Sequence, residues 1–449
     1  MGVALAEIKQ IRAIKGVRDI LPPESAAWNR VERAAHEVFA RFGYGEIRLP
    51  IFEYADLFVR SIGVETDVVQ KETYTFSDAP VQIKAEGVHL EPPPEYDLVT
   101  LRPEATASVC RAYIEHGMQT LPGNVKLYYM GPMFRRERPQ KGRYRQFYQI
   151  GAEVLTPVYA GQENLAADAG IDAELIEMLM EFFAKVGLEG AALQINSIGC
   201  KNCRPKYVEL LREALVKVKD KLGADSQRRI ETNPLRVLDS KLPEEQAIIE
   251  KLPRISDHLC SECRDHFTEV RRQLDLRGIA YEQNWRLVRG LDYYMRTTFE
   301  ITAPGLGSQN AVCGGGRYDG LVELLGGPPT KGIGFAIGED RLMLSLEAAG
   351  KLKPEAAVDA FIVWMGANAQ AAAIHLARKL RDVGVKVEVP AVEMKFGRAL
   401  GLADKLGARH AVIIGENEIA AGKFTVKRLA DAVQKSLSEA ELVAELKGN

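Results

Sequence analysis

The sequence predicts an α+β protein in which a strand-rich core carries a helical insertion and is followed by a separate C-terminal α/β domain. Three segments indicate this fold. Residues 125–156 predict a β-hairpin, because apolar and alternating residues flank a charged tip with a Pro/Gly turn. Residues 200–276 are rich in charge and predicted to be mostly helical. From about residue 357, buried-type strands alternate with helices, which is typical of a largely parallel sheet.

The first third of the chain combines helices with short strands. Apolar residues recur at helical spacing over 25–42, and the glycine that follows suits a helix C-terminus. Residues 46–51 predict a strand, and Pro50 makes it an edge or an interface element because proline lacks an N–H for the ladder. Residues 79–96, rich in proline and acids, predict a loop or an extended hairpin tip. A strand at 98–101 and a helix at 106–116 follow.

The remaining elements follow the same two periodicities. A strongly apolar helix is predicted at 171–186 and a strand at 192–197. After the helical segment, strands are predicted at 285–288, 297–302 and 311–313. In the C-terminal domain we expect strands at 361–366, 386–389 and 411–414, and helices at 369–383 and 398–406.

Composition limits the classes of function. With 46% hydrophobic and 27% charged residues, the chain has the balance of a soluble globular protein. Its net charge of -2 means that a polyanion must be bound by local basic patches. We find neither a signal-peptide pattern at the N-terminus nor an apolar run of membrane-spanning length. We therefore expect a cytoplasmic protein with no membrane partner.

The hairpin tip is the most informative stretch of the chain. It reads FRRERPQKGRYRQF over 134–147, a basic run interleaved with aromatic residues. Strand alternation places Arg143, Phe147, Gln149 and Glu153 on one face of the second strand. A planar guanidinium suits phosphate oxygens and a flat ring suits a nucleobase. The alternative is a solvated hairpin with a generic basic tip, since a basic run alone is a weak signal.

Three further motifs carry polar groups at turns. Glu104 and Thr106, where a strand passes into a helix, could bind an ammonium group or simply cap the helix. The RGLDYY motif at 289–294 delivers an arginine and two tyrosines, and its alternative is a surface turn with packed aromatics. The glycines of CGGGRYDG at 313–320 allow a close approach of the backbone to a ligand, or form a plain loop.

Together these motifs resemble one family. RPEATA, FRRERPQKGRYRQF, RGLDYY, GGGRYDGL and GIGFAIGEDRL are similar to segments of bacterial histidyl-tRNA synthetases, which are class II aminoacyl-tRNA synthetases. The resemblance extends from residue 15 to about residue 428. It implies an antiparallel catalytic sheet flanked by helices, a helical insertion and a C-terminal α/β anticodon-binding domain. It also implies a homodimer with the first helix and the Pro50 strand at the interface.

The resemblance gives a domain division. The catalytic core comprises 1–198, with the 125–156 hairpin as the motif 2 hairpin of class II enzymes, and 277–350. The helical insertion is 199–276, the linker 351–357 and the anticodon-binding domain 358–449.

The resemblance also implies roles for individual residues. Arg135 would bind the α-phosphate of ATP and Arg341 the γ-phosphate, with Glu137 near the adenine, Phe147 stacked on it and Arg143 beside the nucleotide. Glu104, Thr106 and Gln149 would hold the α-amino group of histidine, with Ala105 alongside. Glu153 and a tyrosine of the Tyr293/Tyr294 pair would bond the imidazole nitrogens. Arg289 and Arg135 would be catalytic.

The implied reaction joins L-histidine to tRNA(His). The histidine carboxylate attacks the α-phosphorus of ATP, which releases pyrophosphate, and the terminal ribose hydroxyl of the tRNA then attacks the resulting adenylate. Mg²⁺ would accompany the ATP. The hairpin tip (Arg136, Arg138, Gln140 and Lys141) would contact the acceptor end, since RNA recognition favours unpaired bases and ends.

Two rival functions remain open. One is a non-catalytic histidine-binding regulator of ATP phosphoribosyltransferase; such paralogues typically lack the C-terminal domain and the arginine of RGLDYY, and this chain keeps both. The other is a synthetase for a different amino acid, which RGLDYY and Glu153 argue against.

Two CxxC pairs bracket the helical segment. Cys200 with Cys203, and Cys260 with Cys263, could supply the four thiolates of a closed zinc site. The 56 residues between the pairs exceed the usual ribbon spacing. On spacing alone we favour reduced thiols, or disulfides formed in air, over structural zinc, and we expect no catalytic role for these cysteines.

Overall fold

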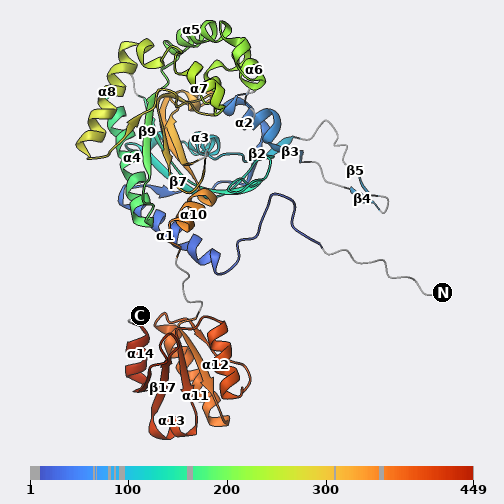
Figure 1. Cartoon of the computed structure of the whole chain (residues 1–449), viewed down its shortest axis with the longest axis vertical. Coiled ribbons are helices and arrows are strands. Elements are labelled where there is room, and N and C mark those ends of the chain that lie inside the picture. The colour runs from blue at the N-terminus through green and yellow to red at the C-terminus, as the bar shows by residue number, and fades with distance from the viewer. Residues whose placement is uncertain are drawn as a thin grey trace, which may run out of the picture. The chain divides into compact units, whose positions relative to one another are not determined.

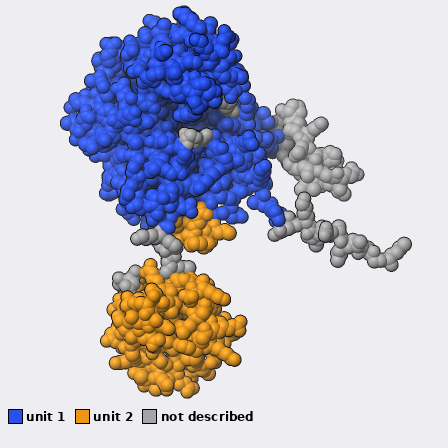
Figure 2. All heavy atoms as spheres, viewed as in Figure 1, with its two compact units in different colours: residues 1–20, 28–352 blue, residues 21–27, 353–449 orange. Residues whose placement is uncertain are grey.

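The computed structural model describes residues 11–63, 66, 68–78, 82–84, 87–89, 97–158, 165–307, 310–352 and 358–447. The chain divides into two compact units, shown in Figure 2. The first comprises Met1–Ile20 and Trp28–Leu352, and the second Leu21–Ala27 and Lys353–Asn449. Among the described residues, no helix has the length and apolar content needed to cross a membrane.

The first unit is built on an eight-stranded sheet (Figure 1). In spatial order its strands are β1 (Gly45–Glu46), β7 (Val125–Phe134), β8 (Gln146–Pro157), β13 (Thr330–Gly338), β12 (Ala311–Arg317), β11 (Met295–Thr302), β9 (Ala192–Ser197) and β10 (Glu282–Gln283). All neighbours pair antiparallel except β1 with β7 and β9 with β10, which are the two edges. The predicted α+β class with an antiparallel-rich sheet is confirmed.

Two smaller sheets are formed by the residues between β1 and β7. The first contains β2 (Phe52–Tyr54), β6 (Leu98–Leu101) and β3 (Tyr74–Ser77), and the second contains β4 (Gln82–Lys84) and β5 (Gly87–His89). The strands β4 and β5 are antiparallel, so the described part of residues 79–96 is a hairpin. The rest of 79–96 lies outside the described residues.

Helices cover both faces of the large sheet. The long helices are α1 (Glu24–Arg41), α3 (Thr106–Glu115), α4 (Leu165–Val186) and α10 (Glu339–Ala348), with shorter α2 (Ala55–Ile62), α9 (Leu321–Leu324) and a turn of π-helix at Val68–Glu72. The ring of Phe39 in α1 lies 5.8 Å from Phe182 in α4 and 6.0 Å from Phe335 in β13, which joins both helices to the sheet. On the other face α3 packs through Val109 and Tyr113 against Tyr129 of β7.

The segment predicted to be helical is helical. It contains α5 (Arg204–Val216), α6 (Ala224–Thr232), α7 (Pro243–Ile249) and α8 (Ser261–Leu276), with 3₁₀ turns at Lys219–Lys221, Pro234–Val237 and Ile255–His258. These helices lie together at one end of the sheet, and α8 packs along α4 (Figure 1). A buried ion pair fixes this region: Arg317 of β12 bonds Asp172 of α4 with Nη2 to Oδ1 at 2.5 Å, and His266 of α8 lies 3.4 Å from the same carboxylate.

The second unit is a five-stranded α/β sheet. Its strand order is β15 (Val387–Glu388), β14 (Ala360–Trp364), β16 (His410–Ile414), β17 (Lys423–Arg428) and β18 (Gln434–Ser438). The helices are α11 (Ala367–Asp382), α12 (Phe396–Lys405), α13 (Glu416–Ala421) and α14 (Glu439–Lys447). The first three strands are parallel, as the βαβαβ rhythm predicts, and β17 and β18 add antiparallel pairs.

Two predicted strands differ from the structure: the strand expected at 46–51 keeps only Glu46, in the edge strand β1, and the one expected at 285–288 is not formed. Pro50 lies between β1 and β2, where Arg102 Nη1 donates to the carbonyls of Leu49 and Pro50 at 3.0 and 3.2 Å, so a side chain takes the place of a β-ladder. Residues 285 and 286 form a turn and 287 and 288 are irregular, because Asn196 Nδ2 donates to the carbonyls of Trp285 and Leu287 at 3.2 and 3.0 Å. The strand of this region is β10, a few residues earlier.

Candidate active site

A cavity of about 300 Å³ opens in the first unit. It is lined from β8, β11, β12, β13, the N-terminus of α3 and the RGLDYY segment. Eleven of the predicted site residues line it: Glu104, Thr106, Arg135, Glu137, Arg143, Phe147, Gln149, Arg289, Tyr293, Tyr294 and Arg341. Segments more than two hundred residues apart in the sequence, from Glu104 to Arg341, therefore meet in one site.

Glu104 both caps a helix and lines the cavity, the two roles that its position in the sequence allowed. Its carboxylate accepts the N–H groups of Thr106 at 2.7 Å and Ala107 at 3.0 Å, which caps α3. It also lines the cavity, so a ligand can reach it. Burial raises the pKa of Glu104, and the two backbone donors oppose that shift. Ala105 is buried between the two polar residues and does not line the cavity.

Glu153 lies deeper than the prediction implied. It is buried and is not among the lining residues; Thr106 Oγ1 donates to its Oε1 at 2.7 Å and Tyr318 Oη to its Oε2 at 2.6 Å. Burial raises the pKa of Glu153 to about 8. Glu153 therefore reaches the cavity through Thr106, a lining residue that it orients.

Arg289 occupies the space left by a glycine. Its Nη1 donates to Glu300 Oε2 at 3.1 Å, and its guanidinium lies 5.7 Å from the ring centre of Tyr294. A Cβ on Gly314 would come within 2.0 Å of Arg289 Nη2. The glycine motif thus makes room for side chains: Gly315 accommodates Phe299 and Gly316 accommodates Tyr294 in the same way.

Three buried polar atoms of residues that line the cavity make no hydrogen bond within the described part of the chain. They are Arg289 Nε, Gln149 Oε1 and Glu137 Oε2. Because buried donors and acceptors are normally satisfied, such atoms in a cavity indicate where a polar ligand binds.

The remaining cations gather around Glu137. Arg143 Nη1 lies 3.4 Å from Glu137 Oε2 and Arg135 Nη1 lies 3.9 Å from its Oε1. Arg135 also places its guanidinium 5.3 Å from the ring centre of Phe147. Arg341 Nη1 donates to the carbonyl of Ala311 at 2.9 Å. Three guanidinium groups in one cavity suit a polyphosphate.

The predicted tRNA contacts lie outside the cavity. Arg136, Arg138, Gln140 and Lys141 are all exposed. Gln140 bridges to Arg143 across the tip, and Arg136 lies 4.7 Å from the ring centre of Tyr74. The tip is thus anchored next to the cavity at Arg143 and presents its other polar groups to solvent.

Several residues of the site were not predicted from the sequence. Tyr129 lines the cavity by crossing over Gly151, where a Cβ would lie 2.3 Å from its hydroxyl. Alternation along β7 and the glycine opposite were the available signals, because the ring of Tyr129 fills the space that Gly151 leaves open. Glu300 and Tyr318 bond Arg289 and Glu153, contacts that only the folded sheet creates.

The four cysteines of the CxxC pairs meet in space. The Sγ atoms of Cys200, Cys203, Cys260 and Cys263 all lie within 4.8 Å of one another.

Residues 16–342 match the family model of histidyl-tRNA synthetase. The chain belongs to this family. Residues 359–449 match the model of an anticodon binding domain. The predicted family is confirmed, and with it the C-terminal anticodon-binding domain.

Curated relatives match over nearly their full length. A histidine–tRNA ligase of Koribacter versatilis is 52% identical over 96% of this chain and 95% of its own, and that of Solibacter usitatus is 52% identical over 97% and 99%. The crystal structure of apo histidyl-tRNA synthetase from S. aureus has a TM-score of 0.75 at 37% identity, covering 98% of this chain and all of that one. These matches confirm the predicted ligase over the regulatory paralogue.

Proposed function

We propose that the cavity of the first unit activates L-histidine with ATP and that the chain then transfers histidine to tRNA(His). One observation carries this proposal: groups suited to an amino acid and groups suited to a triphosphate line the same cavity. The first set is Glu104, Thr106, Gln149, Tyr293 and Tyr294, and the second is Arg135, Arg143, Arg289 and Arg341.

In the first step the histidine carboxylate attacks the α-phosphorus in line, and pyrophosphate leaves. Little proton transfer is needed, so the residues act by positioning and by stabilising charge. Arg289, whose Nε is buried without a partner, lies where it can bond both the carboxylate and an α-phosphate oxygen. Arg135 binds the α-phosphate, Arg341 the γ-phosphate, and Phe147 with Glu137 the adenine.

At the amino-acid end, the α-ammonium group donates hydrogen bonds to the carboxylate of Glu104, the amide oxygen of Gln149 and the hydroxyl oxygen of Thr106. The Tyr293/Tyr294 pair bonds the imidazole, and Glu153 supports that side through Thr106 and Tyr318. A site that bonds a polar side chain rejects analogues without it, because its own groups would be left unpaired.

Magnesium fits the carboxylates of this cavity. Glu137 and Glu300 both line it, and Glu137 Oε2, which faces Arg143 at 3.4 Å, makes no hydrogen bond in the described chain. Carboxylate oxygens together with substrate phosphates are the usual ligands of Mg²⁺. The ion would neutralise charge on the pyrophosphate leaving group.

The tRNA binds through the exposed hairpin tip at its acceptor end and through the C-terminal unit at its anticodon. The match of residues 359–449 to an anticodon binding domain supports the second contact.

The enzyme acts as a cytoplasmic homodimer. Large apolar side chains are exposed on the three-stranded sheet and just before it: Ile51, Phe52, Tyr54, Phe76 and Leu98. A patch of this kind marks a protein interface, and it coincides with the segment around Pro50. Sedimentation analysis tests the dimer, and Phe52→Glu with Tyr54→Glu should yield monomers.

Amino-acid-dependent ATP–pyrophosphate exchange, run with each standard amino acid in turn, tests the activity. We expect exchange with histidine alone. Absence of exchange with any amino acid would favour a binding protein, and exchange with another amino acid would overturn the assignment of substrate.

A further inference from the structure

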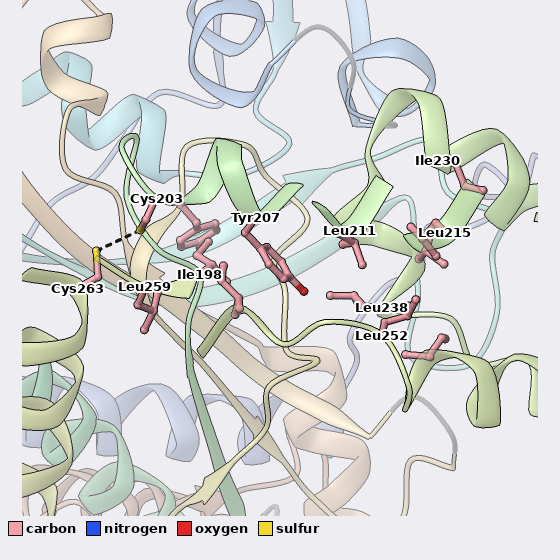
Figure 3. Packing of buried hydrophobic residues seen from close by; sticks show 14 of the residues in the cluster. Ile198, Cys203, Tyr207, Leu211, Leu215, Ile230, Leu238, Leu252, Leu259 and Cys263 are labelled. Carbon is pink, nitrogen blue, oxygen red and sulfur yellow. Dashed lines mark hydrogen bonds between the residues drawn. The ribbon is translucent and has the colours of Figure 1, made fainter. Parts of the chain in front are cut away.

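The two CxxC pairs come from opposite ends of the helical segment. Cys200 and Cys203 lie in the turn between β9 and α5, while Cys260 and Cys263 lie at the start of α8. Figure 3 shows Cys203 facing Cys263 beside Leu259 and Ile198. Packing alone does not require four sulfur atoms at one point, since any small apolar side chain fills such space equally well.

We propose that these four cysteines bind a structural zinc ion. Three Sγ–Sγ separations are 3.8 Å: Cys200 to Cys203, Cys200 to Cys260, and Cys203 to Cys263. A tetrahedral zinc with Zn–S bonds of about 2.3 Å has sulfur atoms about 3.8 Å apart. A disulfide instead needs sulfur atoms about 2.05 Å apart, and all four cysteines are free.

The backbone around the first pair is shaped for thiolate ligands. The N–H of Cys200 donates to Cys203 Sγ at 3.3 Å, and the N–H of Asn202 donates to Cys200 Sγ at 3.5 Å. Such donors orient ligands and stabilise their charge. Gly199 has φ +69°, and a Cβ there would come within 2.8 Å of Cys203 Sγ. Only glycine permits this turn beside the sulfur.

Binding of zinc by these four cysteines needs no redox step. Zn²⁺ replaces one proton on each of the four thiols, the protons pass to solvent, and no sulfur is oxidised. The product is a net negative cluster. Arg204 follows Cys203 directly and Arg264 follows Cys263, so each pair carries a nearby cation.

Hydrogen bonds connect the cysteine cluster to the catalytic cavity. Ile198 and Gly199 exchange backbone hydrogen bonds with Arg296 at 2.9 and 2.8 Å, and Arg204 Nη1 donates to the carbonyl of Tyr294 at 2.5 Å. Arg296 Nη2 also lies 3.3 Å from Glu262, inside the second CxxC pair.

Tyr294 belongs to the same buried cluster as Cys200, Cys203 and Cys263. The zinc would therefore fix the segment after β9 against the segment that carries Tyr293 and Tyr294. Its role is structural, and its effect on histidine binding rests on the function proposed above.

Metal content tests the site directly. Protein purified without a metal-affinity tag should contain about one zinc per chain by elemental analysis. Cys260→Ser should lose it, and Cys260 is the best position to change because it is the least buried of the four. Cys110→Ala is the matched control: it removes a buried cysteine of α3 and should keep the zinc.

A second measurement uses the chain without substitutions, so its outcome does not depend on whether a variant folds. Removal of metal with a chelator should lower the thermal unfolding midpoint, and added Zn²⁺ should restore it. Co²⁺ in its place should give the visible absorption of a tetrahedral thiolate site. Metal-free protein of full stability, or intact mass showing disulfides in protein kept under reductant, would overturn the proposal.

The proposed zinc site and the proposed ligase activity can be refuted independently of each other. Zinc content and unfolding are measured without substrates, so a zinc-loaded chain with no exchange activity would refute only the ligase. An active, zinc-free chain would refute only the metal site. If both hold, metal removal should raise the KM for histidine more than the KM for ATP.

Discussion

The guanidinium of Arg289 lies against the backbone of Gly314, so close that a Cβ there would stand 2.0 Å from Arg289 Nη2. No rotation of a methyl group relieves such a contact, since the Cβ position is fixed by the backbone. The position of the central cation of the cavity is thus set by the absence of a side chain on the neighbouring strand.

Gly314→Ala should therefore inactivate the enzyme without touching a substrate group. We expect histidine-dependent pyrophosphate exchange to fall by about 10²-fold or more, as for direct loss of a charge-stabilising donor. The control is Gly401→Ala in α12, where a Cβ meets nothing within 4 Å. That change should leave exchange intact and stabilise the helix slightly. Normal activity in Gly314→Ala would show that Arg289 is free to act elsewhere.

Arg289→Ala tests the catalytic role of this guanidinium by removing it. If its contacts form mainly in the transition state, kcat should fall more than KM rises, with a loss of roughly 2.7–4 kcal/mol, or about 10²–10³ in rate. Arg289→Lys should restore little, because a point charge cannot bridge two oxygens as the planar fork does. Steady-state exchange kinetics give both constants. An exchange rate near that of the unchanged enzyme would end the assignment.

Glu153 makes stability depend on pH. Its pKa is about 8 in the fold against an ordinary 4.5. Between those values the native carboxyl is protonated and the unfolded one is ionised, so stability falls as pH rises, by about 1.4 kcal/mol per pH unit from this group.

Glu153→Gln removes the titrating carboxyl and with it this contribution to the pH dependence of stability. The free energy of unfolding in denaturant should fall less steeply from pH 5.5 to 7.5 in Glu153→Gln than in the unchanged chain. The exposed Glu115→Gln should leave the slope as it is. An unaltered slope in Glu153→Gln would mean that the carboxyl is already ionised in the native state.

Local patterns predicted the elements better than the site. The strands Leu98–Leu101 and Ala192–Ser197 match the expected ranges residue for residue, because alternation and flanking turns are encoded locally. The strand predicted at 285–288 is not formed, because Asn196, far away in sequence, donates hydrogen bonds to the carbonyl groups of Trp285 and Leu287.

The same reason limits prediction of the site. Motifs supplied Arg135, Arg289, the tyrosine pair and the segment that holds Gly314. No local pattern shows that Arg289 lies against Gly314 or bonds Glu300, because both contacts depend on the order of the strands. The cysteines show the limit most clearly, since spacing argued against zinc and only the fold brings the sulfur atoms within 4.8 Å.

The buried pair of Arg317 and Asp172 should be costly to break. Asp172→Asn removes one of the two carboxylates that bond a guanidinium with 2% exposure, Asp319 being the other, and breaking such a buried pair costs about 3–5 kcal/mol. The matched control is Asp56→Asn, which breaks an exposed pair with Arg60 and should cost less than about 1 kcal/mol. Equilibrium unfolding in denaturant measures both. Similar losses in the two variants would mean that the buried charge is hydrated.

The hairpin tip separates the two steps of the reaction. Arg136 and Gln140 are exposed and do not line the cavity, so histidine and ATP should bind normally without them. Arg136→Ala and Gln140→Ala should therefore reduce aminoacylation of tRNA(His) far more than pyrophosphate exchange. The control is Arg60→Ala, which removes an exposed arginine of α2 and should alter neither assay. Because an acceptor end is held partly by its phosphates, the defect in Arg136→Ala should also make aminoacylation less sensitive to salt. Equal losses in exchange and aminoacylation would show that the tip serves the cavity and does not contact the tRNA.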